Sequence, residues 1–447
     1  MPLRRPLACM AALLACGAAP AQAQSLLQLH EAMRSYDAAY QSALASAQAS
    51  QARADQARAG LLPQVGVQAG AQRSRSETSV LDSRTGRAFN VLNAAVVGSQ
   101  PLYRPANRIA LAQAQHAAEA AQTNLAAVEQ DLIVRLAQAY FDVLAAQDAL
   151  ASVRALKAAV SEQLEAARRN FEVGNATITD AREAQARFDL ATAQEIATDN
   201  DLRVKKLALD QLVGRSDTEP RPLALPVELP APQPDEVARW VAQASDAHPG
   251  VLQARAALDI ARLETDKART GHRPTVDLQA SVGQTRYPDG NPGLAAAPRA
   301  SSHTTNASIG VVLNWPLFAG FAVENRVRET LALEDKARAD LDSVQRTVSQ
   351  ATRAAFFGVR SGLSQVKALQ AAEQSSLTAL QANQLGYRVG VRINIDVLKA
   401  QSQLYQTQRE LARARYDVLV GGLRLKHASG SLTAADLTPI NQLLKPQ

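Results

Sequence analysis

The sequence predicts a mainly helical protein with a smaller β-strand content, built from one unit that occurs twice in tandem. Three observations predict this class. Two long tracts carry apolar residues at spacings of three, four and seven, four shorter stretches alternate apolar and polar residues, and one half of the chain matches the other. Aromatic residues make up only 4 % of the chain and alanine dominates its apolar fraction, which suits long, closely packed helices better than a thick globular core.

The internal repeat relates residues 101–214 to residues 316–430. The clearest matches lie 216 residues apart: 140–141 (YF) and 356–357 (FF), 171–174 (FEVG) and 387–390 (YRVG), and Asp180 and Asp396. We therefore divide the chain into a signal peptide at residues 1–23, a first repeat at 24–214, a proline-rich connector at 215–234, a second repeat at 235–430 and a C-terminal tail at 431–447. Each repeat is expected to hold an opening helix, two strands and a long helical hairpin.

The first 23 residues have the organisation of a secretory signal peptide. A basic head at Met1–Arg5 is followed by an apolar run at Leu7–Ala19 and a small-residue cleavage site that ends at Ala23. This run is too short to span a membrane, and no later segment reaches the about 18 apolar residues expected of a membrane helix. Export is therefore expected, and any membrane contact would use strands or surface helices.

Both cysteines lie in this leader. Residues 13–16 (LLAC) also resemble a lipoprotein cleavage site, which leaves acylation of Cys16 as an alternative. A mature chain that begins at Gln24 has no cysteine, which excludes disulfides, thiol catalysis and cysteine metal sites. Removal of Arg4 and Arg5 lowers the formal charge from +6 to +4, and nothing in the chain resembles a nucleic-acid-binding surface.

Four strands are predicted from alternating apolar and polar residues, two in each copy. They lie at residues 65–71, 89–103, 276–282 and 307–315, the second of them placed mainly from the repeat. Pro101 and Pro316 are expected to end the strands that lead into the long helices. A polar loop that begins at Tyr287 connects the strands of the second copy.

Helices account for most of the remaining chain. Residues 25–60 predict one amphipathic helix that Pro63 ends, and residues 235–270 repeat it. The tracts at 105–171 and 323–387 each correspond to about 100 Å of helix. Each tract is expected to turn at its Val-Gly pair and run back over a similar distance as a coiled-coil hairpin. We expect the connector and the tail to wrap the helical body midway along it.

The four strands allow two interpretations. On period alone, they could form a water-facing sheet with its apolar face against a helix. Their length, the aromatic residues Tyr103 and Trp315 at strand ends, and the export signal favour an outer-membrane barrel. A membrane barrel needs at least about eight strands, because an open edge would leave backbone groups unpaired in lipid. Several chains must therefore share one barrel.

Taken together, these features resemble the TolC family of outer-membrane efflux and secretion channels. The resemblance covers essentially the whole mature chain and rests on the order and spacing of residues 61–65 (LLPQV), 100–103 (QPLY), 173–180, 387–390 (YRVG) and 396–398 (DVL). It implies a homotrimer in which each chain gives four strands to a twelve-stranded outer-membrane β-barrel, continued into the periplasm by a twelve-helix barrel. The implied partners are a periplasmic adaptor protein and an inner-membrane ABC transporter or proton-driven pump, which supplies the energy. No cofactor and no enzymatic chemistry are implied.

The resemblance also assigns functional positions at the helical turns. Thr179, Asp180, Tyr387 and Arg392 match positions that link neighbouring coils and hold the periplasmic end shut, and Asp396 matches a carboxylate that rings the constriction. Lys399 stands where a second acidic residue is expected, so the preference for cations should be weaker. The hairpin tips that would contact the adaptor are Val173, Gly174, Val389 and Gly390. Arg392→Ser combined with Asp180→Ala is expected to raise the single-channel conductance.

The residues alone also allow simpler roles. Asp180 and Asn394 stand where helix-capping residues belong, with Glu183 three positions after Asp180 as in a capping box. The six histidines lack metal-ligand spacing, and the chain has no glycine-rich phosphate loop or nucleophile elbow, so an enzyme is not expected. A soluble periplasmic helical-hairpin adaptor would explain the coiled coils but not the paired strands. Type I protein secretion and small-molecule efflux are both compatible with the sequence, and its general character slightly favours secretion.

Overall fold

The computed structural model describes residues 24–80, 83–174, 176–291 and 300–445. The predicted signal peptide, with the alternative acylation site at Cys16, lies outside the described residues, as does part of the predicted loop after Tyr287. The chain forms two compact units. The hairpin unit comprises Met1–Leu44, Leu125–Val251 and Gln345–Gln447, and the sheet unit comprises Ala45–Asn124 and Leu252–Val344.

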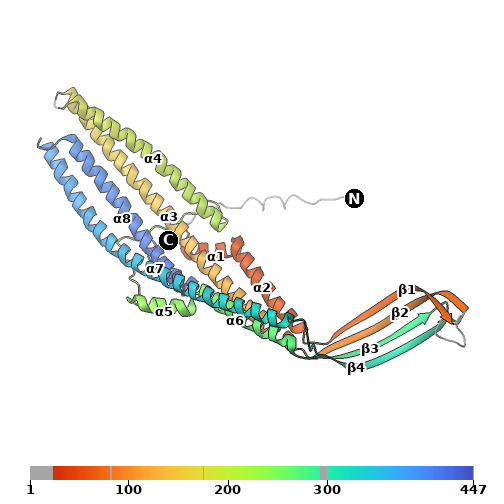
Figure 1. The fold of residues 1–447 in the computed structure, drawn as a ribbon. Helices are drawn as coiled ribbons and strands as arrows, with labels where there is room; N and C mark the ends of the chain where they lie inside the picture. The colour runs from red at the N-terminus through yellow and green to blue at the C-terminus, as the bar shows by residue number, and fades with distance from the viewer. Residues whose placement is uncertain (1–23, 81–82, 175, 292–299, 446–447) are drawn as a thin grey trace, which may run out of the picture. The chain divides into compact units, whose positions relative to one another are not determined.

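The sheet unit contains one antiparallel sheet with the strand order β1-β2-β3-β4 (Figure 1). Its strands are β1 (Gln64–Val80), β2 (Ser83–Tyr103), β3 (Thr275–Tyr287) and β4 (Ser302–Asn314). β2 continues past Pro101 to Tyr103 through an irregular register, and β4 ends at Asn314, before Pro316. The prediction that these prolines end the strands is therefore wrong for Pro101. A proline lacks a donor N–H, and an irregular part of the ladder tolerates that loss.

The register gives the sheet one apolar and one polar face. Val67 pairs with Val96, Val96 with Val282, and Val282 with Ala307, so these side chains share a face across all four strands. The same face carries Val65, Ala69, Ala71, Leu92, Ala94, Leu278, Ala280, Ile309, Val311 and Leu313. Val65 on β1 is 75 % exposed and Ile309 on β4 is 77 % exposed. The opposite face carries Gln64, Gln68, Asn93, Gln279, Ser281, Ser308 and Asn306.

The opening helix of each copy is broken in two, so the prediction of one continuous helix is wrong. In the first copy α1 (Leu26–Tyr36) and α2 (Ala38–Ala59) are separated by Asp37, whose backbone is extended and whose carboxylate accepts a hydrogen bond from the Tyr40 N–H at 2.8 Å. In the second copy α5 (Val237–Ala247) and α6 (Pro249–Arg269) are separated by His248. His248 precedes a proline, which disfavours the helical conformation there. A short 3₁₀ turn, η1 (Thr270–His272), follows α6.

Two helical hairpins follow the strands, as the tandem duplication predicts (Figure 1). They are α3 (Pro105–Glu172) with α4 (Ile178–Val213), and α7 (Ala322–Arg388) with α8 (Asn394–Ala428). The returning helices have 36 and 35 residues against 68 and 67 in the outgoing ones, so the expected return over a similar distance is wrong. α4 ends because Gly214 adopts the left-handed conformation (φ 72°) and the proline-rich connector follows.

Within the sheet unit, other helices flank the parts of α3 and α7 that the returning helices do not reach. Asn107 Nδ2 on α3 donates to the Gly60 carbonyl at the end of α2 at 2.6 Å. Arg326 on α7 contacts Glu264 on α6 at 2.7 Å. Within this unit, α2 therefore lies against α3 and α6 against α7. Across the part of the chain that the structure describes, no helix combines the length and apolar character needed to cross a membrane.

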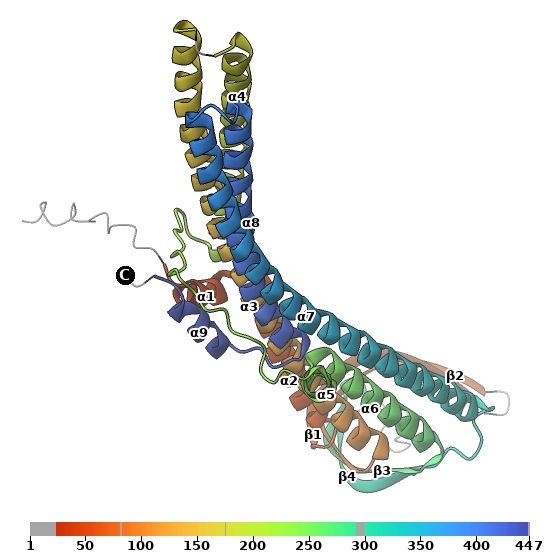
Figure 2. The ribbon, with the colours of Figure 1, turned by 90° about the vertical axis from the view of Figure 1, so that its left-hand side faces the viewer.

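The main core lies in the hairpin unit, where the connector and the tail pack on the hairpins. Figure 2 shows α1 beside α9 (Leu437–Gln442), which follows the 3₁₀ turn η2 (Ala434–Asp436). The buried cluster joins side chains of α1, α3, α8, the connector and the tail: Leu26, Leu29, Met33, Leu132, Leu136, Phe141, Leu223, Tyr416, Leu432, Leu437 and Leu444. Backbone bonds from Ala224 to Leu443 and from Lys445 to Pro222, both 2.9 Å, tie the connector to the tail.

Candidate channel aperture at the hairpin tips

The first hairpin tip, between α3 and α4, is fixed by a capping box. Gly174 takes the left-handed conformation (φ 77°), and Thr177 is the extended N-cap residue of α4. Asp180 Oδ2 accepts from the Thr177 N–H at 3.1 Å and from its hydroxyl at 2.7 Å. The capping box is therefore Thr177 with Asp180, not Asp180 with Glu183. Asp180 is already helical and occupies the third position, where the reciprocal acidic residue of the motif belongs.

The second tip, between α7 and α8, also turns at a left-handed glycine but is stabilised by a different contact. Gly390 is left-handed (φ 80°), and the N-cap residue of α8 is Ile393, which offers no side-chain oxygen. The carboxylate of Asp396 instead lies 3.7 Å from Arg392 Nη1. Asn394, expected as a cap, is the first helical residue and is buried. Its side chain is hydrogen-bonded to Gln163 on α3.

A hydrogen bond joins the two hairpins near their tips. Asn170 Nδ2 on α3 donates to the Tyr387 hydroxyl on α7 at 3.3 Å. The residues 216 positions away are Gly386 and Phe171, which can form no equivalent bond. Gly386 has its own role, because a Cβ there would approach Arg392 Cγ to 2.7 Å and its carbonyl accepts the N–H groups of Val391 and Arg392.

The predicted site residues fall into two groups. Arg392, Asp396 and Lys399 line one groove, together with Ser375, Ser376 and Asn383 of α7. Thr179 is exposed, and among the described residues the side-chain bonds of Asp180 stay within its own turn, so one chain does not join Asp180 to Arg392. The tip residues Val173, Gly174, Val389 and Gly390 are all exposed.

Sequence reasoning missed Asn170, Gln163, Thr177 and Gly386. Comparison of the two copies could have found them, because all four have counterparts of a different type. In the same order, the counterparts are Gly386, Ala379, Ile393 and Asn170. At these positions each copy carries a group that the other copy cannot replace.

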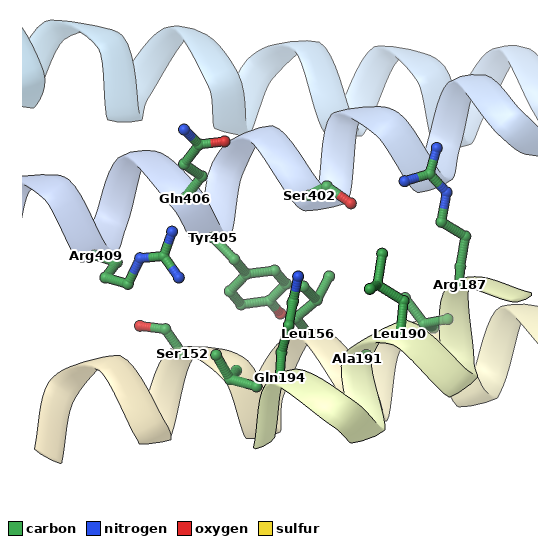
Figure 3. A pocket seen from close by; sticks show the side chains of 12 residues that line it. Ser152, Leu156, Arg187, Leu190, Ala191, Gln194, Ser402, Tyr405, Gln406 and Arg409 are labelled. Carbon is green, nitrogen blue, oxygen red and sulfur yellow. The ribbon is translucent and has the colours of Figure 1, made fainter. Parts of the chain in front are cut away.

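A second groove lies farther along the hairpins, between α3, α4 and α8 (Figure 3). Leu156, Leu190 and Ala191 supply apolar lining, whereas Arg187 on α4 and Arg409 on α8 stand at opposite ends. In the ranges covered by the structure, no cluster of three or more His, Cys, Asp or Glu side chains could hold a metal ion. Both grooves are lined by polar and apolar side chains of the helices.

Comparisons with known proteins agree with this architecture. The sequence profile of the family described as "Outer membrane efflux protein" matches residues 23–215 and 240–431, one match per copy. The chain is 32 % identical to the outer membrane protein TolC of Vibrio cholerae over 95 % of this chain and 94 % of that protein. It is 30 % identical to the alkaline protease secretion protein AprF of Pseudomonas aeruginosa, over 93 % and 83 % of the two chains.

Solved structures show the same fold. The outer membrane protein VceC of Vibrio cholerae superimposes with a TM-score of 0.78 and 20 % identity, over 91 % of this chain and 96 % of that one. Sequence and fold thus agree along nearly the whole chain. The chain belongs to the TolC family of outer membrane efflux proteins, which are outer-membrane channels that extend into the periplasm.

Proposed function

We propose that this protein is the outer-membrane channel of a tripartite export system and works as a homotrimer. In this proposal a periplasmic adaptor joins it to an inner-membrane transporter, which supplies the energy, and the channel performs no chemistry itself. The observation that carries the proposal is a four-stranded sheet with two open edges and an exposed apolar face.

The sheet cannot serve in lipid as a single copy. β1 and β4 are edge strands, and their unpaired backbone groups would each cost several kcal/mol in a bilayer. Three copies joined edge to edge would form a closed barrel of twelve strands. The backbone groups of every edge strand would then be hydrogen-bonded, and the apolar face would point towards lipid. The strands have 13 to 21 residues, which exceeds the about 9–11 that a tilted membrane strand requires.

The helices give independent support for neighbouring copies. Phe141 and Phe357 are equivalent in the repeat, yet Phe141 is 1 % exposed and Phe357 is 55 % exposed. Phe141 stacks on Tyr416 at 5.6 Å between ring centroids, whereas Phe357 contacts the adjacent Phe356 ring and otherwise faces outward. Ile196 and Leu207 on α4 are also exposed. In a trimer, these exposed apolar side chains would be buried against neighbouring copies.

We assign the periplasmic aperture to Thr179, Asp180, Tyr387, Arg392, Asp396 and Lys399, and adaptor contact to Val173, Gly174, Val389 and Gly390. The Asn170–Tyr387 hydrogen bond joins the two tips of one chain, and the Arg392–Asp396 ion pair stabilises the second tip. Repeated by threefold symmetry, such weak contacts would keep a two-state aperture mostly closed until the adaptor arrives.

For the cargo, we favour type I protein secretion. The similarity to AprF, a protein named for alkaline protease secretion, supports this choice. Small-molecule efflux is the second candidate, because the matched family is described by efflux. Expression in a host that lacks its own channel, together with a protease-exporting ABC transporter and adaptor, separates the two. Protease in the medium supports secretion, whereas restored drug resistance without protease supports efflux.

Assembly is tested by cross-linking between sheet edges. Gly66 on β1 and Gly310 on β4 have no atom within 4 Å of an added Cβ, and a mature chain from Gln24 has no other cysteine. The Gly66→Cys, Gly310→Cys double variant, treated in outer membranes with a short bis-maleimide, should yield covalent trimers. Each single variant is a control and should yield none. A water-soluble monomer that leaves liposomes intact would refute the channel.

A further inference from the structure

The apolar face of the sheet ends in a group of arginines. Ala71 on β1, Leu92 on β2 and Arg286 on β3 are in register on this face. The next residues of β1 that point the same way, towards the β1–β2 turn, are Arg73 and Arg75. The change from apolar to basic therefore occurs at about the same level on β1 and β3.

These three arginines are exposed. Among the residues that the structure describes, none makes a hydrogen bond or ion pair with Arg73, Arg75 or Arg286. Two carboxylates lie nearby without pairing to them. Asp289 accepts from the backbone and side-chain nitrogens of Asn90, at 3.2 and 2.6 Å, and Glu77 lies one step farther along the same face of β1.

Their position identifies the environment, given the proposed function on which this inference rests. A charged side chain on the lipid face of a barrel is costly at the midplane and costs little near the interface. Tyr103 and Trp315, both exposed, mark the end of the sheet next to the helices. The arginines lie towards the opposite end of the sheet, away from the helices. That end lies in the outer leaflet when the helices are periplasmic.

We propose that Arg73, Arg75 and Arg286 form a binding site for the phosphate groups of an outer-leaflet lipid. A guanidinium group binds a phosphate through two parallel hydrogen bonds. One strand separates β1 from β3, which places the two sets of arginines about 10 Å apart across the sheet. That spread suits a lipid with two separated phosphates on an acylated headgroup, namely bis-phosphorylated lipid A. Its acyl chains would then lie along the apolar face of the same strands.

Native mass spectrometry of the purified trimer in detergent tests this site. Bis-phosphorylated lipid A should bind at up to one copy per chain, and dephosphorylated lipid A and phosphatidylethanolamine should bind at least tenfold more weakly. The Arg73→Gln, Arg75→Gln, Arg286→Gln variant should lose at least tenfold in lipid A affinity. Arg53→Gln, Arg182→Gln, Arg353→Gln, which removes three exposed helical arginines, is the charge-matched control and should bind like the unmodified protein.

Each single sheet substitution is measured as well, so the test holds if the triple variant does not assemble. Equal lipid A binding by the sheet variants and the unmodified trimer would overturn the proposal, as would equal binding of phosphorylated and dephosphorylated lipid. Single-channel conductance in planar bilayers is recorded in parallel. A conducting trimer without phosphate-dependent lipid binding refutes the site alone, whereas a chain that neither trimerises nor conducts refutes the proposed function.

Discussion

The side-chain amide of Asn170 donates to the hydroxyl of Tyr387 across 3.3 Å, and this bond joins the first helical hairpin to the second close to their tips. The two partners are not equivalents in the repeat, because the counterpart of Tyr387 is Phe171 and that of Asn170 is Gly386. Divergence of the two copies thus created a contact that a symmetric pair of hairpins could not make. It is a natural point at which to test the proposed aperture.

Tyr387→Phe removes this bond and little else. A net contribution of about 1 kcal/mol per chain becomes about 3 kcal/mol in a trimer, which shifts a closed-to-open ratio by about two orders of magnitude if all three chains must release. We expect a higher single-channel conductance or open probability in planar bilayers. Asn170→Ala should have the same effect, and the double variant should add little to either. Unchanged conductance in intact trimers of both variants would contradict a role in closure.

The Arg392–Asp396 pair and the Thr177–Asp180 capping box can be separated by substitution. Arg392→Ser and Asp396→Asn remove an exposed ion pair worth about 0–1 kcal/mol per chain, and each should raise conductance. Asp180→Ala breaks the capping box and should lower the stability of the tip by about 0.5–2 kcal/mol.

The double variant Arg392→Ser, Asp180→Ala is expected to conduct best, because it loosens both tips. Thr177→Val is its matched control, since it breaks the capping box and leaves the Asp180 carboxylate in place. If Thr177→Val raises conductance as much as Asp180→Ala does, Asp180 acts only as a cap. Thermal unfolding measured on the same trimers reports the loss of the cap separately.

Lys399 should reduce the cation preference of the channel. It is exposed and shares a groove with Asp396 and Arg392, so its charge offsets the carboxylate there. Lys399→Glu exchanges three positive for three negative charges in a trimer. We expect the reversal potential in a KCl gradient to shift towards the potassium equilibrium potential, with Lys399→Gln giving about half the shift. A reversal potential that does not move would place Lys399 away from the conduction path.

Phe357→Ser should weaken the trimer. Burial of a phenylalanine side chain contributes about 1.5–3 kcal/mol, and within one chain Phe357 realises less than half of that burial. The trimeric fraction in mild detergent should fall at a protein concentration where the unmodified protein stays assembled, as measured by light scattering after size exclusion. Tyr36→Ser, which removes another exposed aromatic side chain of the hairpin unit, is the comparison. Equal effects of the two substitutions would contradict a specific contact.

Two histidines predict a loss of stability in mild acid. Burial lowers the pKa of His248, helped by the nearby charge of His427, and burial also lowers the pKa of His427 against an opposing effect of Asp131. The folded state then binds these protons less readily than the unfolded state, so their stabilising contribution is complete above about pH 6.5 and is lost as the pH falls below it. The melting temperature should drop between pH 7 and pH 5. His427→Gln should flatten that drop, and an unchanged profile would rule out a contribution of His427.

The sequence by itself determined the repeat, the helical hairpins and the strands. The repeat follows from matching residues 216 positions apart. The helices follow from apolar residues three or four positions apart, as at Leu132 and Leu136, and the strands from apolar residues at every second position, as at Val65 and Val67. The positions of the two tips were also predictable, because only glycine takes a left-handed conformation readily, as Gly174 and Gly390 do.

Tertiary structure decided the contacts between segments far apart in the chain. The break at Asp37 is stabilised in part by an ion pair with Arg135, 98 residues away, and periodicity carries no record of such a partner. Asn394 is likewise buried and hydrogen-bonded to Gln163, 231 residues away, instead of capping α8. Local sequence sets the backbone conformation over a few residues, whereas the pairing of polar groups and the burial of Phe141 but not Phe357 depend on what the fold brings beside them.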